Sequence, residues 1–103
     1  MLSRKLMVAM LFVLLLAAGA VQAGGDAANG KVLSADCADC HGDMGLGEAE
    51  VTAIAGMAAV AHAKKLSDFK AGVAESEMND FAADLSEQDI LDLAAYYATL
   101  PAK

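Results

Sequence analysis

The sequence predicts an all-α fold, with three main helices joined by long loops. Residues 58–71 and 86–100 carry apolar side chains at intervals of three and four, which is the spacing of one helix face. Residues 27–38 are rich in alanine, the residue with the highest helix propensity. We therefore expect helices in these three segments and loops between them.

The first predicted helix spans residues 27–38, with Asp26 as its N-terminal cap. Gly30 lies inside it, where a glycine costs about 1 kcal/mol relative to alanine. Such a glycine usually marks the close approach of another backbone, and a frayed helix start is the alternative. We expect loops at residues 42–47, and residues 48–56 remain ambiguous.

The second helix, residues 58–71, is expected to end at Gly72. Its apolar stripe consists of Val60, Ala63, Leu66 and either Phe69 or Lys70. Residues 73–84 are polar and are expected to be irregular, with Met78 in their middle.

The third helix begins with a capping box, in which Ser86 is the cap and Asp89 reaches back to it. Pro101 ends it. Its apolar stripe consists of Ile90, Leu93, Ala94, Tyr97 and Leu100.

Residues 1–23 have the pattern of a secretory signal peptide. Arg4 and Lys5 precede an unbroken apolar run at 6–18, and Val21-Gln22-Ala23 provides a cleavage site. We expect a mature domain of residues 24–103 with no membrane span. An uncleaved anchor is the alternative, although the apolar run is shorter than the roughly 20 residues of a membrane helix.

The mature chain would be strongly acidic, with five lysines against 14 carboxylates and a net charge of −9. Nucleic acid is excluded as a partner, because phosphate binding needs a basic face. A basic protein surface is the expected counterpart. A domain of about 80 residues with four aromatic side chains and no tryptophan rarely builds a sufficient core without a bound group or a covalent staple.

The motif Cys37-Ala38-Asp39-Cys40-His41 is the pattern for covalent attachment of a c-type haem. Its spacing lets both sulfurs reach the vinyl-derived carbons of a porphyrin, and His41 then becomes the usual first axial ligand. A disulfide or a thioredoxin-like dithiol is less consistent, because no strand precedes the motif. A zinc site would need four ligands, which could come only from these three residues and His62.

The mature chain resembles the small bacterial class I cytochromes c and is similar to the half-domains of dihaem cytochromes c. The matching segments are Gly24-Gly25-Asp26, Gly30-Lys31, residues 37–42, Gly45, Gly47, Ile54-Ala55-Gly56, residues 64–72, residues 85–90 and residues 93–98. The resemblance implies the class I cytochrome c fold, wrapped around one covalently bound haem c with its iron. It also implies that the first and last helices cross, with Gly30 packed against Tyr96 or Tyr97.

The resemblance makes Met78 the second axial ligand and predicts that His41 donates its other ring N–H to a backbone carbonyl. Relatives usually have a proline at that carbonyl, where this chain has Thr52. Met57 stands where relatives usually have glutamine, which makes it a rival ligand. Met44 lies too close to His41 to reach the opposite face of a haem.

The remaining polar and aromatic candidates have simpler interpretations. His62 is expected to be a surface or half-buried residue rather than an iron ligand. Lys64 and Lys65 are interpreted as solvated charges, and Tyr96 and Tyr97 as residues that pack helices together.

The resulting prediction is a periplasmic, monomeric, monohaem electron carrier that is not an enzyme. It would pass one electron between donor and acceptor redox proteins that have basic docking surfaces. A haem-bearing electron-transfer subunit of a larger oxidoreductase complex is the alternative. A ligand-sensing haem with an open sixth site is a third possibility.

Overall fold

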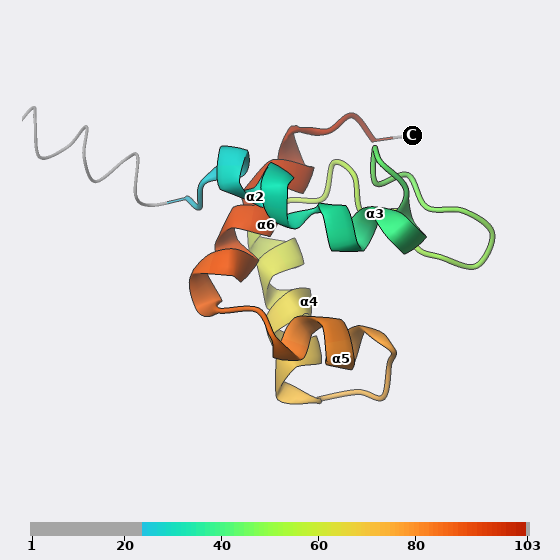
Figure 1. The fold of residues 1–103 in the computed structure, drawn as a ribbon, viewed down its shortest axis with the longest axis vertical. Helices are drawn as coiled ribbons and strands as arrows, with labels where there is room; N and C mark the ends of the chain where they lie inside the picture. The colour runs from blue at the N-terminus through green and yellow to red at the C-terminus, as the bar shows by residue number, and fades with distance from the viewer. Residues whose placement is uncertain (1–23, 103) are drawn as a thin grey trace, which may run out of the picture.

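The computed structural model describes residues 24–102 of the chain, and these residues form an all-helical fold (Figure 1). The predicted signal peptide, residues 1–23, lies outside the described residues. The helices are α2 (Ala27–Leu33), α3 (Ala35–His41), α4 (Ala59–Ala71), α5 (Met78–Ala83) and α6 (Glu87–Thr99). Residues 24–102 contain no strand, only an isolated antiparallel bridge between Glu48 and Val51. The predicted all-α class is confirmed.

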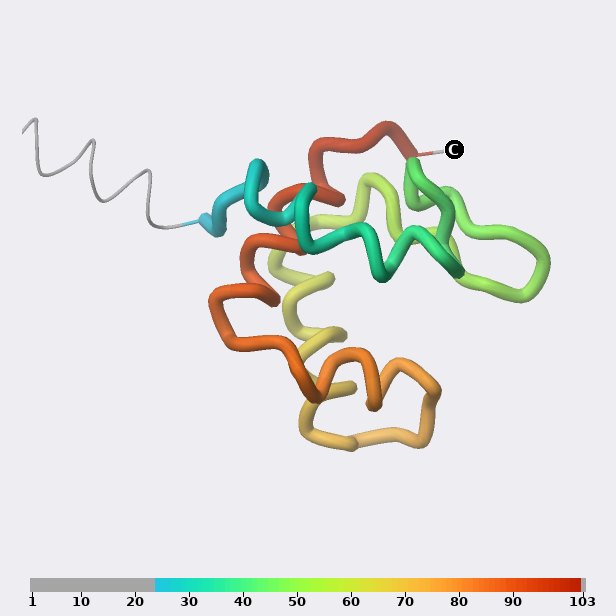
Figure 2. Tube along the Cα trace, in the orientation of Figure 1, coloured from blue at the N-terminus to red at the C-terminus, as the bar shows by residue number. Residues whose placement is uncertain are grey.

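The first predicted helix is in fact two short helices that meet at Ser34, and the second extends to His41. Asp26 caps α2 as predicted, because its carboxylate accepts hydrogen bonds from the N–H groups of Ala28 and Asn29 at 3.0 and 3.2 Å. At the junction, the Ser34 hydroxyl donates to the carbonyl of Lys31 at 2.6 Å. Serine hydroxyls that bond back in this way bend helices, and the chain bends here (Figure 2).

Helix α2 lies against α6 at a crossing that only glycine permits. Gly30 is buried, and a Cβ atom built there would overlap the main-chain carbonyl of Asp92 and lie 2.8 Å from the Cβ of Tyr96. The predicted contact between Gly30 and an aromatic residue of the last helix is therefore confirmed, and Tyr96 is the partner.

A buried carboxylate fastens the same crossing. Asp92 of α6 is 2% exposed, and it accepts hydrogen bonds from the N–H of Asp26 at 2.6 Å and the amide of Asn29 at 2.8 Å. The amide of Gln88 donates to it as well, at 2.8 Å. Burial alone would raise the pKa of this carboxyl, but the three donors outweigh burial and lower it.

Helix α4 ends as predicted, since Gly72 adopts the left-handed conformation with φ of 70°. The predicted apolar stripe is wrong at Val60, which is 85% exposed. The stripe is confirmed at Leu66, which is buried, and at Ala63, which packs against the core; the other buried residue of α4 is His62, four positions before Leu66 on the same face. The inward face of α4 therefore includes His62 and excludes Val60.

The predicted irregular segment, residues 73–84, contains α5. Side-chain hydrogen bonds outside the helical ladder hold it. The Ser76 hydroxyl accepts from the N–H of Met78 at 3.1 Å, and the Lys70 ammonium of α4 donates to the carbonyls of Ala83, at 3.0 Å, and Leu85. A six-residue helix is too short to show a periodic pattern, so these contacts had no signature in the sequence.

Helix α6 begins with the predicted capping box, in which Ser86 and Asp89 exchange hydrogen bonds at 3.0 Å in both directions. It ends at Thr99, just before Pro101. Its inner face forms the centre of the core, which consists of Leu66, Ile90, Leu93 and Tyr97.

The helices do not all pack together. Helix α6 packs against α2 and α4, and α5 packs against α4. Among the described helices, the backbone of α3 comes close only to that of α2, although its Cys37 side chain packs against the core cluster that includes Tyr97 of α6. No helix within residues 24–102 is long and apolar enough to span a membrane.

The crossing at Gly30 can be tested with Gly30→Ala. The substitution gains helix propensity but overlaps the backbone of α6, so we expect a net loss of about 1–3 kcal/mol in the free energy of unfolding. Urea denaturation of the holoprotein measures it. Gly24→Ala is the control, because a Cβ there meets nothing within 4 Å. Equal stability of the two variants would contradict the close crossing.

The Asp92 cluster predicts a specific pH dependence. Because the folded-state pKa is lowered, the ionised carboxylate stabilises the fold above the ordinary aspartate pKa of about 3.9, and this stabilisation is lost as the pH falls through the folded-state pKa. We expect Asp92→Asn to lose about 1.5–3 kcal/mol at pH 7 and to show a weaker acid dependence than wild type. Urea denaturation at pH 7 and pH 3 measures both, with the exposed Glu75→Gln as control. An unchanged acid dependence would show that Asp92 does not stabilise the crossing.

Candidate cofactor site

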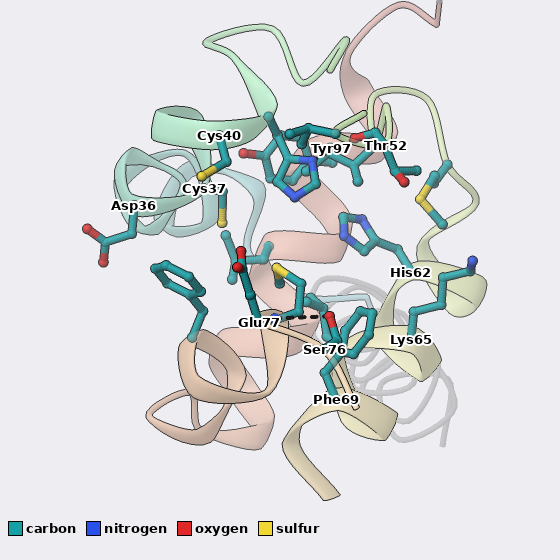
Figure 3. A pocket seen from close by; sticks show the side chains of 18 of the residues that line it. Asp36, Cys37, Cys40, Thr52, His62, Lys65, Phe69, Ser76, Glu77 and Tyr97 are labelled. Carbon is teal, nitrogen blue, oxygen red and sulfur yellow. Dashed lines mark hydrogen bonds between the residues drawn. The ribbon is translucent and has the colours of Figure 1, made fainter. Parts of the chain in front are cut away.

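A cavity of about 440 Å³ lies between α3, the loop before α4, and helices α4, α5 and α6 (Figure 3). The four predicted site residues, Cys37, Cys40, His41 and Met78, all line it. They come from α3 and α5, which are not in contact with each other. The fold therefore brings together residues that the sequence separates by up to 41 positions.

The two cysteines face the cavity from α3. Their spacing of three residues places both on one side of the helix, and both thiols are free, with Cys37 half-buried and Cys40 exposed. Burial raises the pKa of the Cys37 thiol, with Asp36 adding to the effect. Before any haem is attached, burial therefore favours the protonated thiol of Cys37 at neutral pH, and the two cysteines are not joined in a disulfide.

His41 is oriented by a main-chain carbonyl. Its Nδ1 lies 2.6 Å from the carbonyl oxygen of Thr52, so Nδ1 carries the proton and donates it. Nε2 then keeps its lone pair for a metal. The predicted backbone acceptor is thus present although Thr52 replaces the proline of relatives.

The loop that supplies this carbonyl folds back on Gly45. The Gly45 carbonyl accepts from the N–H groups of Ile54 and Ala55 at 2.7 and 2.8 Å. Gly45 is buried with φ of 68°, and a Cβ there would lie 2.9 Å from the Tyr97 ring. The loop can therefore approach α6 this closely only with glycine at this position.

Two of the three candidate methionine ligands line the cavity. Met78 is half-buried at the first position of α5 and packs against the core cluster. Met57 also lines the cavity, whereas Met44 is 47% exposed and is not among the lining residues. The geometry keeps Met78 and Met57 as candidates.

The prediction for His62 is wrong in one respect, because the side chain is buried, with 4% of its surface exposed. It lines the cavity, its ring centroid lies 5.5 Å from that of Tyr97, and its Nδ1 has no hydrogen-bond partner. Burial lowers the pKa of His62 to about 4, with smaller contributions from His41 and Lys65. The signal for its burial was the spacing of four residues from Leu66, which places both on one face of α4.

Tyr97 packs as predicted, at the centre of the core and 1% exposed. Burial, and then Cys37, raise its pKa, so its hydroxyl remains protonated. The Tyr96 ring lies edge-on to it at 5.2 Å. A zinc site finds no support, because residues 24–102 contain no group of three or more His, Cys, Asp or Glu side chains that could hold a metal ion.

The donor set fits a haem. A single, largely apolar space is surrounded by two thiols on one edge, an imidazole with a free Nε2, and a thioether. This combination matches the covalent and axial ligands of a c-type cytochrome. The all-helical fold and this site define a class I c-type cytochrome.

Comparisons with known proteins support this class. Residues 27–101 match the family model for cytochrome c, and the chain belongs to the cytochrome c family. Its structure is similar to that of reduced recombinant cytochrome c4 from Pseudomonas stutzeri, with a TM-score of 0.72 and 32% sequence identity. The match covers 77% of this chain but only 47% of that chain. A comparison with curated protein sequences gave no match.

Family membership establishes the cofactor. The protein carries covalently attached haem c with its iron, and Cys37 and Cys40 fit the attachment motif. The cytochrome c family consists of haem c electron-transfer proteins.

The bond between His41 and Thr52 involves only the main chain of Thr52. We therefore expect Thr52→Ala to leave the visible spectrum and the reduction potential unchanged. Gly45→Ala should displace the loop and weaken the bond, which makes His41 a less basic ligand and raises the potential. Potentiometric titration of both holoproteins measures this. If Thr52→Ala shifts the potential as much as Gly45→Ala, the orientation of His41 depends on the threonine side chain.

Proposed function

We propose that this protein is a periplasmic, monohaem carrier that moves one electron at a time between redox proteins. Cys37 and Cys40 attach the haem, and His41 and Met78 are its axial ligands. The observation that supports this most strongly is that residues from α3 and α5 line one cavity, with the imidazole already oriented by the Thr52 carbonyl.

Attachment uses the two thiols of α3. Each S–H would add across one vinyl group, so that sulfur forms a bond to carbon and the thiol hydrogen goes to the other vinyl carbon. No electrons are gained or lost in this addition. Free cysteines on one side of α3 are what this chemistry requires, and a disulfide would block it.

The axial residues would determine what the site can do. Bound haem supplies an iron that alternates between the ferrous and ferric states, accepting one electron from a donor and giving it to an acceptor. Met78 would provide a neutral, soft thioether that favours the ferrous state and raises the reduction potential. With His41 and Met78 both bound, no coordination position would remain for a substrate, which is consistent with a carrier rather than an enzyme.

Features of the sequence support the proposed location and partner. A signal peptide at residues 1–23, with a mature domain at 24–103, would export the chain to the periplasm. The acidic mature chain would bind donors and acceptors through basic surfaces, and this association should weaken as salt is added.

Visible spectra of Met78→Ala and Met57→Ala test the ligand assignment. We expect the wild-type holoprotein to show a low-spin spectrum with the weak red band of iron–thioether ligation. Met78→Ala should lose this band, because no other side chain would replace the thioether, and Met57→Ala should keep it.

The opposite pattern would make Met57 the ligand. Rapid binding of carbon monoxide to reduced wild type without denaturant would show an open sixth position, and would overturn the carrier assignment in favour of a sensing haem.

A further inference from the structure

The cavity has two different ends. Cys37 and Cys40 approach it from α3, and His62 and Lys65 approach it from α4 on the opposite side (Figure 3). His62 and Lys65 are three residues apart, so they lie on neighbouring positions of one helix face. One end therefore carries the thiols, and the other carries an imidazole and an ammonium group.

The charges around the cavity are sorted in the same way. Asp36, Glu50 and Glu77 are the carboxylates among the lining residues, and Asp36 and Glu77 lie toward the cysteines (Figure 3). Lys65 is the one lysine among the described residues that line the cavity. The α4 end is thus the end at which an anionic group would be stabilised.

His62 needs a partner that the chain does not supply. Its side chain is 4% exposed, and its Nδ1 is buried without a hydrogen bond, a state that costs about 1–3 kcal/mol. The Tyr97 ring lies beside it at 5.5 Å between centroids, but an aromatic ring does not replace a hydrogen-bond partner. The imidazole also lines the cavity, where a ring N–H can donate a hydrogen bond to an acceptor on the cofactor.

The chemistry of haem c places such an acceptor at this end. The vinyl-derived carbons sit on two adjacent pyrrole rings, and the two propionate carboxylates sit on the other two. Thioether bonds to Cys37 and Cys40 would therefore turn the propionate edge away from α3. We propose that His62 and Lys65 bind a haem propionate, with the imidazole as hydrogen-bond donor and the ammonium as counter-charge.

This assignment rests on the proposed attachment through Cys37 and Cys40, and it gives the two residues distinct tasks. His62 is fixed by burial, so it would hold the carboxylate in one place. Lys65 is exposed, and its flexible stem lets the ammonium swing over the rim of the cavity. Together they would offset the negative charge beside the iron, which favours the ferrous state and raises the reduction potential.

The neighbouring lysine is a natural control. Lys64 pairs with Asp68 at 2.8 Å on the exposed side of α4 and does not line the cavity. Removing its charge changes the net charge of the protein by the same amount as removing that of Lys65. A difference between the two variants would therefore report position rather than overall charge.

The test uses the holoproteins His62→Leu, His62→Asn, Lys65→Gln and Lys64→Gln. Resonance Raman spectroscopy reports hydrogen bonding of the propionates through their bending modes, and potentiometry reports the charge near the iron. We expect His62→Leu to shift a propionate mode and lower the potential, and His62→Asn, which keeps a donor, to restore part of both. Lys65→Gln should lower the potential more than Lys64→Gln.

The outcomes separate the two proposals. The propionate assignment alone would be overturned if the His62 and Lys65 variants keep the covalent haem and the thioether band but show unchanged propionate modes and unchanged potentials. Loss of the low-spin spectrum in His62→Leu would also overturn it, by showing that His62 binds the iron. Absence of covalent haem or of the thioether band in wild type would overturn the proposed function itself. Lys65→Gln, at an exposed position, keeps the test decisive if His62→Leu does not fold.

Discussion

The close crossing of α2 and α6 determines where the attachment motif lies. Among the described helices, the backbone of α3 comes close only to that of α2, so the position of its cysteines depends on where α2 lies. Gly30 lets the two backbones meet, and Asp92 fastens them through donors on α2 and before it. Helix α6 then contributes Leu93 and Tyr97 to the wall of the cavity. One crossing therefore sets the distance between the motif and the wall that faces it.

The cavity lies where the centre of the hydrophobic core would otherwise be, so a group bound in it would complete the core as well as the site. Among the described residues, the fully buried hydrophobic side chains outside it are few, and the backbone of α3 comes close only to that of α2. Phe81 lines the cavity while 54% exposed, and Val51 lines it while 36% exposed. A planar apolar group in this space would cover these side chains and connect α3 to α4 and α5. A domain of about 80 residues rarely builds a sufficient core without such a staple, so we expect binding of the cofactor and folding to be coupled.

Features that depend on only a few adjacent residues could be predicted from the sequence. The capping box at Ser86 and the helix end at Gly72 depend on local geometry, and the attachment motif is itself local. The burial of His62, the fastening by Asp92 and the helix at Met78 depend on partners far along the chain. Val60 shows the same limit, because a small apolar residue on a helix fits either face until the neighbouring helices define which one is inside.

Helix α4 connects the two parts of the proposed haem centre, which are the methionine ligand on α5 and the propionate contacts of His62 and Lys65. An isolated helix of six residues is not stable in water, so α5 cannot hold a methionine in place by itself. The Lys70 ammonium of α4 bonds the carbonyls at and just beyond the C-terminal end of α5, where a positive charge also suits the helix dipole. Ala82 of α5 is fully buried, and Met78 packs into the core at the other end.

Because Lys70 follows His62 by about two turns of the same helix, a shift of α4 would move the thioether and the proposed propionate contacts together. The stiffness of α4 would therefore keep both in place when the iron changes charge, which is what rapid electron transfer requires.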